Sequence, residues 1–429
     1  NFKFLIPVAL ILIPAFLAIF YGLAVYLLSL FNINNPFSNL FLFSLLIGTI
    51  EFLRGTILTG FPWNLIAYSF SNNLEIIQIT SFIGTYAFNM LCLTFFTTPA
   101  IFILSKKKKD IILCIFFLLS PIILYVIGSS KINTFQSSKP IQNDHVVRAI
   151  GSNINLDRFY GDKDTMSVID ELIKLSEPNL DIQTLFIWPE GIIPNINQSE
   201  LKDYDFLFKK RFNKNHLLGI GINNYKTDVN KDIFYNSLSF YDHEINLINN
   251  YNKVNLVPFG EFLPLDKILG RIGLKSLTNN YQSYSKGKNR EIIKIAHNNF
   301  AIKLLPLICY EIIYSGKIFK DPEFDYIINI SEDGWFGDSV GPHQHFTHSI
   351  FRAIESGKYL IRSANNGITA IINPMGIIEK KIPFGSSGYI DFSNKRIVKN
   401  TLFSHHGNKM FLIIILLYIF LIFSFNRIS

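Results

Sequence analysis

The feature that most constrains this chain is the placement of long apolar runs at its two ends. Four runs occupy roughly residues 4–31, 37–58, 76–104 and 111–127, and a fifth covers 410–425. A helix needs about 20 apolar residues to cross the hydrocarbon core of a bilayer, so each run is near the length of a membrane span. The first 105 residues carry only four charged side chains. We therefore expect a multi-pass membrane protein and exclude a wholly soluble one.

Four consecutive lysines, at positions 106–109, predict the orientation of these spans. They lie in a very short connection between the third and fourth apolar runs, and short basic loops stay on the cytoplasmic side. Residues 128–409 then face the opposite side, and the fifth run returns the chain to the cytoplasm. The lysines supply half of the formal net charge of +8. The positive charge is therefore a topology signal, and no nucleic-acid partner is expected.

Between the fourth and fifth runs, β-rich segments alternate with amphipathic ones. The expected strands are 145–152, 185–188, 217–223, 237–241, 300–307, 326–330, 359–362 and 369–372, and the expected helices are 163–176 and 345–356. This alternation is typical of an α/β domain, where ligand groups gather at strand ends. We expect a bundle of four helices over 1–127, a globular domain over 128–409 and a last helix over 410–429.

Three residues suit the chemistry of a cysteine nucleophile, and two of them, Glu190 and Cys309, lie at expected strand ends. Glu190 lies in FIWPE, Lys253 in YNKVNLVPFGEFLP, and Cys309 in PLICYEIIY. Such a nucleophile needs a base and a means of stabilising the oxyanion. Glu190 can accept the thiol proton, and Lys253 can lower the thiol pKa and stabilise the oxyanion. The backbone N–H that follows Cys309 is a natural second donor.

Each of these residues also has a purely structural interpretation. Cys309 is the only cysteine outside the apolar runs, and a buried cysteine is more often a small apolar side chain than a nucleophile. Glu190 can cap a helix, and Lys253 can be a surface charge. His345 and His348 can share a helix face and bind a metal, but no nearby carboxylate completes the ligand set. We expect neither a metal nor a cofactor.

Two charged side chains, Glu51 and Arg54, interrupt the second apolar run. Their spacing of three lets them face each other on a helix. Charge inside a membrane is costly and usually functional, and a structural pair near the interface is the alternative. The loop that follows, GFPW, contains Trp63, an aromatic residue of the kind that lies at membrane interfaces.

Four motifs, taken in order, resemble the nitrilase (carbon–nitrogen hydrolase) superfamily: WPEGIIP, KVNLVPFGEFLP, ICYEIIY and DGWFGDSVGPHQH. Combined with apolar runs on both sides, with LRGTILTGFPW and with RSANNGITAIINPMG, they make nearly the whole chain similar to the apolipoprotein N-acyltransferase family. The resemblance implies a nitrilase-like αββα sandwich inserted before the last helix of an α-helical transmembrane bundle. It also implies a bacterial inner membrane, with the catalytic domain facing the periplasm.

The resemblance assigns roles to individual residues. It implies that Glu190 is the base, that Lys253 stabilises the oxyanion and that Cys309 is the nucleophile. Glu261 matches the family's second glutamate, which helps to hold the lysine and the leaving group. The remaining matched residues are supporting neighbours of the nucleophile and aromatic substrate contacts: Tyr310, Glu311, Trp63, Trp335 and Phe336.

The sequence departs from the family pattern in two places. Glu332 stands where an asparagine is usual before DGWFG, so we expect that loop to differ in detail. The family typically has about eight membrane helices, and only five runs here are long enough to span a bilayer. We expect the chain to lack three N-terminal helices.

The activity implied by the resemblance is acyl transfer in lipoprotein maturation. A fatty acyl chain passes from a membrane phospholipid, through a thioester on Cys309, to the α-amino group of the diacylglyceryl-cysteine of an apolipoprotein. The implied partners are the phospholipid, the apolipoprotein and the bilayer. One alternative is a membrane-tethered amidase or nitrilase that hydrolyses a small C–N substrate with the same three residues. Another is a transporter or lipid-binding protein with an inert nitrilase-like domain.

Overall fold

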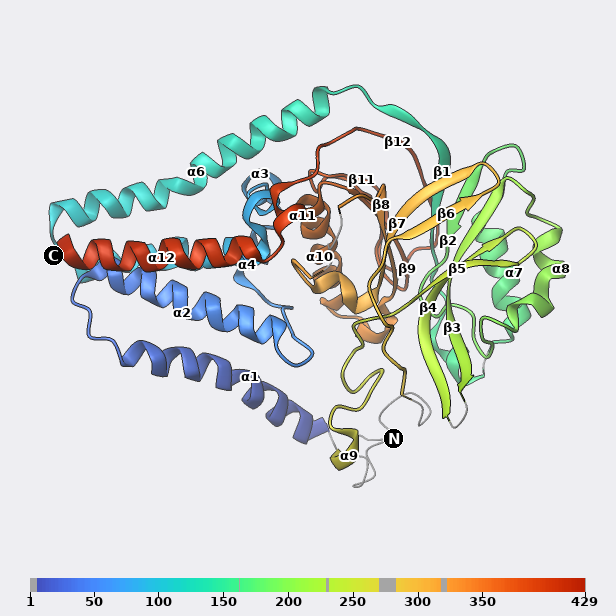
Figure 1. The fold of residues 1–429 in the computed structure, drawn as a ribbon, viewed down its shortest axis with the longest axis horizontal. Helices are drawn as coiled ribbons and strands as arrows, with labels where there is room; N and C mark the ends of the chain where they lie inside the picture. Colours follow the sequence, from blue (N-terminus) through green and yellow to red (C-terminus); the bar gives the residue numbers. More distant parts are fainter. Residues whose placement is uncertain (1–5, 162, 229–230, 270–282, 318–321, 429) are drawn as a thin grey trace.

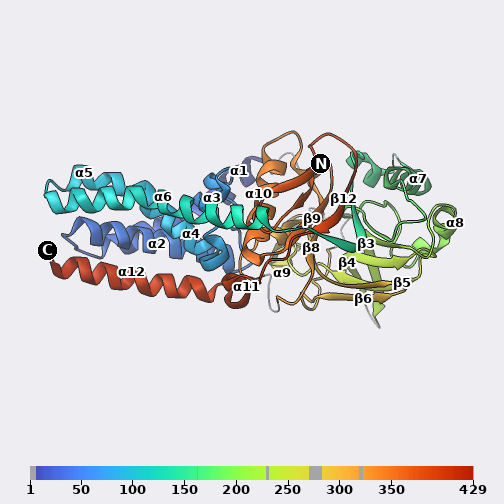
Figure 2. The same ribbon diagram turned by 90° about the horizontal axis from the view of Figure 1, so that it is seen from above.

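The computed structural model describes residues 6–161, 163–228, 231–269, 283–317 and 322–428. The molecule is elongated, with a bundle of long helices at one end and two packed sheets at the other (Figure 1). The view from above has the same division, with the C-terminus at the tip of the bundle farthest from the sheets (Figure 2).

Within the described residues, five helices are long and apolar enough to cross a membrane. They are α1 (Ile6–Ser29), α2 (Pro36–Thr56), α4 (Thr80–Thr97) continued by α5 (Ile101–Leu104), α6 (Lys108–Ser137) and α12 (Lys409–Ile428). These helices match the five predicted apolar runs and fit a transmembrane protein. The helix α6 continues to Ser137, well beyond the apolar run predicted to end at residue 127. Its last turns are largely polar, so the apolar run alone did not indicate that they are helical.

Local sequence explains where two of these helices begin or bend. The side chain of Asn35 caps α2 by accepting hydrogen bonds from the backbone N–H groups of Phe37 and Ser38. The helix α4 is kinked at Gly84, whose φ of +78° favours glycine. A Cβ there would lie 2.0 Å from the ring of Phe403 in α11 (Leu402–His406). The absence of a side chain at Gly84 therefore lets Phe403, in the segment before the last helix, pack against α4.

The first sheet has six strands, in the order β12 (Gly388–Lys395), β1 (Ile141–Gly151), β2 (Thr184–Ile187), β3 (His216–Asp228), β4 (Lys231–Asp242) and β5 (Leu247–Asn252). The central strands β1, β2 and β3 are parallel, and the outer pairs are antiparallel. The parallel register aligns Ile187, the last residue of β2, with Gly219 of β3.

The second sheet has the order β11 (Ile378–Ile382), β10 (Thr369–Ile372), β9 (Tyr359–Asn365), β8 (Tyr326–Glu332), β7 (Phe300–Ile308) and β6 (Ile293–His297). Here β7, β8 and β9 are parallel. All seven residues of β8 are buried, as expected for a strand covered on both faces.

Four layers make up the globular part (Figure 1). The helices α7 (Thr165–Ser176) and α8 (Asp205–Lys209) cover the outer face of the first sheet, and α10 (Gly341–Ser356) lies between the second sheet and the bundle. The two inner faces share one apolar core. The other face of the second sheet shares a core with the membrane helices. The predicted αββα sandwich on a helical bundle is confirmed.

Candidate active site

The carboxylate of Glu190 lies just past the end of β2 and is held through both oxygens. Oε1 accepts hydrogen bonds from Nζ of Lys253 at 3.0 Å and from Nδ2 of Asn236 at 2.7 Å. Oε2 accepts one from the backbone N–H of Glu332 at 2.9 Å. The side chain is only 8% exposed. Its orientation is therefore fixed before any substrate arrives.

The ammonium group of Lys253, directly after β5, lies between two carboxylates. Its Nζ is 3.0 Å from Glu190 and 2.9 Å from Glu261, and the side chain is 1% exposed. Burial opposes the charge, but the two carboxylates outweigh burial and raise the pKa of Lys253 well above its ordinary value. Glu261 is itself held by the backbone N–H of Val257 at 2.8 Å. Lys253 is therefore a fixed cation.

The backbone places Cys309 in a strained turn at the end of β7. Its φ of +47° lies in the left-handed region, which is unfavourable for a residue with a side chain and is typical of functional sites. The residue opens a short 3₁₀ helix, Cys309–Ile313. The ring nitrogen Nε2 of His345 lies 3.2 Å from the carbonyl oxygen of Cys309, and Nδ1 lies 2.9 Å from Asp333. A buried pair thus supports the turn.

The thiol of Cys309 is neutral in this environment. Burial and the nearby carboxylate of Glu190 raise its pKa well above the ordinary value, against an opposing effect of Lys253. Lys253 lowers the thiol pKa, as expected, but burial and the nearby carboxylates outweigh its effect, so the net shift is upward. A neutral thiol needs a base during its attack, and Glu190, which lines the same cavity, is the candidate for that role.

The buried carboxylate of Glu311 ties the cysteine turn to the lysine segment. It accepts hydrogen bonds from the backbone N–H of Ile308 at 2.9 Å, of Val254 at 2.9 Å and of Asn255 at 3.0 Å. It also pairs with Arg290 at 2.9 Å. Because one side chain binds both segments, it sets the position of Cys309 relative to Lys253.

A cavity of about 580 Å³ brings most of the predicted residues together. Its lining includes eight of them: Glu190, Lys253, Cys309, Glu261, Tyr310, Trp63, Trp335 and Phe336. Glu311 is absent from the lining and acts on the site through the contacts just described. The lining thus combines charged side chains (Glu190, Lys253 and Glu261) with a wall of aromatic side chains (Trp63, Trp335 and Phe336).

The membrane-side loop after α2 forms part of this wall. Trp63 donates a hydrogen bond from Nε1 to Gln344 of α10 at 2.8 Å, and its ring stacks on His345 with centroids 5.6 Å apart. Arg54, in the last turn of α2, donates hydrogen bonds to the carbonyl of Phe61 at 2.8 Å and to the side chain of the adjacent Asn64 at 2.8 Å. The membrane helices therefore help to build the site.

Two tyrosines of the cysteine turn complete the contact with that loop. The hydroxyl of Tyr310 donates to the carbonyl of Gly60 at 2.9 Å, and that of Tyr314 donates to the carbonyl of Thr59 at 2.7 Å. Tyr310, the residue beside Cys309, is thus anchored on the membrane-side loop.

The two charges of α2 do not form the facing pair that their spacing predicts. Glu51 accepts hydrogen bonds from Asn89 of α4 and from Tyr21 of α1, whereas Arg54 holds the loop around Trp63. Each charge therefore has polar partners of its own, and Arg54 contributes to the geometry of the cavity.

Several cavity residues are absent from the predictions made on the sequence. They are Phe159, Tyr160, Asn223, Asn236 and Tyr284. His345, which the sequence suggested only as a metal ligand, also lines the cavity. Asn236 lies in the interior of β4, and its Nδ2 bridges Glu190 and Glu261 at 2.7 and 2.8 Å. An asparagine on a partly buried strand is a detectable signal, because such a side chain needs hydrogen-bond partners. Among the described residues, no group of three or more His, Cys, Asp or Glu side chains could hold a metal.

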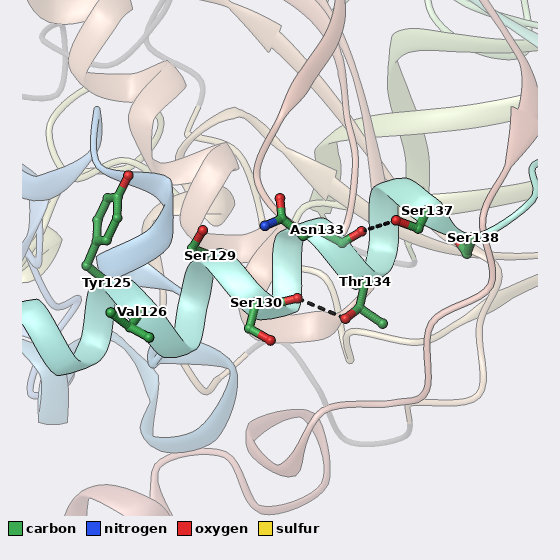
Figure 3. Close-up of a pocket in the computed structure, with 8 residues that line it drawn as sticks. All are labelled: Tyr125, Val126, Ser129, Ser130, Asn133, Thr134, Ser137 and Ser138. Atoms are coloured by element: carbon green, nitrogen blue, oxygen red, sulfur yellow. Dashed lines mark hydrogen bonds between the residues drawn. The ribbon is translucent and has the colours of Figure 1, made fainter.

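A larger hollow, of about 760 Å³, lies along the second half of α6 and has no comparable chemistry (Figure 3). None of its lining residues is charged. The hydroxyls of Thr134 and Ser137 donate to carbonyls of their own helix, at 2.9 and 2.8 Å. It is an open polar face of a helix, so the smaller cavity is the candidate site.

Comparison with known proteins identifies the family of the chain. The carbon-nitrogen hydrolase family model matches residues 185–393, and the model of the apolipoprotein N-acyltransferase N-terminal domain matches residues 2–97. The apolipoprotein N-acyltransferase of Rickettsia prowazekii is 34% identical over 417 residues, which cover 95% of this chain and 80% of the relative. The chain belongs to the apolipoprotein N-acyltransferase family.

A second relative and one solved structure extend the comparison. The apolipoprotein N-acyltransferase of Rhizobium etli is 31% identical over 91% of this chain and 74% of the relative. A Saccharomyces cerevisiae member of branch 10 of the nitrilase superfamily is 16% identical, with a TM-score of 0.40 over 60% of this chain and 93% of its own. Family membership makes the chain an enzyme of the N-acyltransferase type. It does not support the alternative of a small-substrate amidase or nitrilase.

Proposed function

We propose that the chain transfers a fatty acyl group from a membrane phospholipid to the α-amino group of the diacylglyceryl-cysteine of an apolipoprotein. One observation carries the proposal. The cavity that contains Glu190, Lys253 and Cys309 is walled by Phe61 and Trp63 of the membrane-side loop. A site for small soluble substrates has no need of a wall from the membrane helices, whereas a site for two lipids does.

In the first step, Sγ of Cys309 attacks the ester carbonyl carbon of the phospholipid. Glu190 accepts the thiol proton as the sulfur–carbon bond forms, and Lys253 and the N–H of Tyr310 stabilise the oxyanion. The ester carbon–oxygen bond then breaks, and Glu190 returns the proton to the departing alkoxide. The products are a lysophospholipid and a thioester on the enzyme.

In the second step, the α-amino group of the acceptor attacks the thioester carbon. Glu190 accepts a proton from the attacking nitrogen, an amide bond forms and the carbon–sulfur bond breaks. The departing thiolate of Cys309 recovers a proton from Glu190, which restores the enzyme. Water must be excluded while the thioester exists, and the aromatic wall of the cavity suits that requirement.

We propose a bacterial inner membrane location with the sandwich in the periplasm. In both ribbon views, the start of α6 and the C-terminus lie at the end of the bundle farthest from the sheets (Figures 1 and 2), and Figure 2 shows α5 at the same end. The lysines at 106–109 lie at that α5–α6 connection. The excess of basic residues in short cytoplasmic loops supports a cytoplasmic position for that end.

Mass spectrometry of the enzyme incubated with phospholipid tests the proposal. The peptide containing Cys309 is expected to gain one acyl group, sensitive to hydroxylamine as a thioester is, and Cys309→Ala is expected to abolish the gain. Cys92→Ala is the matched control, because Cys92 is buried in α4, away from the cavity. Acylation that persists in Cys309→Ala would overturn the proposal.

A further inference from the structure

A buried ion pair beside the cavity has no role in the mechanism above. Nη2 of Arg158 lies 2.6 Å from Oε2 of Glu332, and their side chains are 0% and 2% exposed. Burying two charges costs free energy that their attraction often fails to recover. The contacts of the pair therefore decide what it does.

The Glu332 side of the pair fixes a hydrogen bond to the proposed base. Its carboxylate accepts from Nδ2 of Asn365 at 2.7 Å and from the N–H of Gly334 at 2.9 Å. Its own backbone N–H donates to Oε2 of Glu190 at 2.9 Å. The side chain thus holds in place the peptide group that orients the base.

The Arg158 side of the pair holds the chain just after the base. Nη2 donates to the carbonyl of Gly191 at 3.3 Å, and Nη1 donates to the carbonyl of Asn155 at 3.2 Å. Gly191 directly follows Glu190. The base is therefore constrained on one side through Glu332 and on the other through Arg158.

The same guanidinium group supports the aromatic wall of the cavity. The central carbon of Arg158 lies 4.1 Å from the centroid of the Phe159 ring, a cation–π distance. Phe159 stacks on Trp335, with centroids 5.6 Å apart and planes 14° apart. Both rings line the cavity, and Trp335 follows Gly334, which binds Glu332. The ion pair is thus connected to both rings.

We propose that Arg158 and Glu332 are a positioning pair, which sets the orientation of Glu190 and places the Phe159–Trp335 wall of the cavity. The inference rests on the proposed function for the identity of the substrate. Glu332 reaches the lining of the cavity and Arg158 does not, and the pair acts through Glu190, Phe159 and Trp335.

Paired substitutions separate positioning from stability. Arg158→Met or Glu332→Leu alone leaves one buried charge without its partner, so each is expected to lower the Tm. The double variant removes both charges, and apolar replacement of a buried ion pair is often neutral for stability. We expect its Tm to return close to that of the wild type. Arg148→Met/Asp391→Leu is the matched control, because that ion pair joins β1 to β12 away from the cavity.

The rate of thioester formation on Cys309 in a single turnover is the decisive readout. A misplaced base typically costs about 100-fold, so we expect the Arg158→Met/Glu332→Leu variant to stay roughly 10- to 100-fold below wild type although its Tm recovers. The control double variant is expected to react at the wild-type rate. A rate that recovers together with the Tm would mean that the pair only stabilises the fold, and would overturn the inference.

Two further measurements keep the inference testable if that variant folds poorly or if the lipid reaction fails. Arg158→Lys retains the ion pair but loses the planar contact with Phe159 and the forked donors, so a stable but slow enzyme is expected. Alkylation of Cys309 by iodoacetamide requires the same base and no lipid. Wild-type alkylation without acylation would count against the proposed function alone, whereas equal alkylation rates in wild type and Arg158→Lys would overturn the positioning role.

Discussion

Replacing Lys253 with methionine tests the electrostatics of the cavity. The ammonium group lies 3.0 Å from Oε1 of Glu190 and 2.9 Å from Oε1 of Glu261. The two oxygens are thus at most about 6 Å apart, and two unit charges at that distance repel by about 3 kcal/mol at an effective dielectric constant of about 20. Without the cation, the two carboxylates are expected to share a proton.

Two losses then combine in Lys253→Met. The oxyanion loses a donor, which typically costs about 10²- to 10³-fold in rate. The shared proton also blocks Glu190 for part of the time, and a repulsion of about 3 kcal/mol corresponds to as much as another 100-fold. We expect thioester formation to slow by roughly 10³- to 10⁵-fold.

Single-turnover acylation of Cys309, followed by mass spectrometry, measures this loss. Lys317→Met is the matched control, because Lys317 is exposed and binds a carbonyl of α2. Adding Glu261→Gln to Lys253→Met removes the repulsion but not the oxyanion defect, so about tenfold or more of the rate is expected to return. Acylation by Lys253→Met within threefold of wild type would refute the electrostatic argument.

Three further outcomes follow from the same geometry. The difference in thiolate absorbance between wild type and Cys309→Ser is expected to stay flat up to about pH 9, because the thiol pKa of Cys309 is raised. Glu190→Gln removes a negative charge near the thiol and should move the titration of Cys309 to lower pH. An inflection near pH 8 in the wild type would contradict the raised pKa. Trp63→Ala loses a hydrogen bond and a ring contact, so the KM for a fluorescent phospholipid in mixed micelles should rise about tenfold, with Trp63→Phe in between. Glu311→Gln leaves a buried arginine without its partner, so it should cost about 3–5 kcal/mol, seen as a Tm lower by roughly 10 °C, whereas the exposed Glu291→Gln should leave the Tm unchanged.

The central strands of both sheets could be predicted from the sequence, and the edge strands could not. The strands β2, β8 and β9 are buried on both faces, and each contains a short apolar run that the sequence shows. The four unpredicted strands, β5, β6, β11 and β12, are the edges of the two sheets. In β11, three consecutive residues are exposed. An edge strand of this kind has no apolar pattern that distinguishes it from a polar loop.

The proposed catalytic residues were predictable because all three lie in distinctive motifs and because Glu190 and Cys309 also follow predicted strands. Their partners were not, because the contacts join distant elements. Asn236 reaches Glu190 from β4, and Arg158 reaches Glu332 across 174 positions of the chain. The unusual residue at 332 is visible in the sequence, but only the fold reveals the arginine that pairs with it.

The most direct test of the account is a two-stage chase of the enzyme with labelled phospholipid. The first stage, without acceptor, is expected to load one labelled acyl group onto Cys309 as a thioester. The second stage adds a peptide whose N-terminal residue is diacylglyceryl-cysteine, and the label is expected to leave Cys309 and appear as an amide on that peptide in equal amount. Label that never reaches Cys309, or that leaves it only as free fatty acid, would contradict the account.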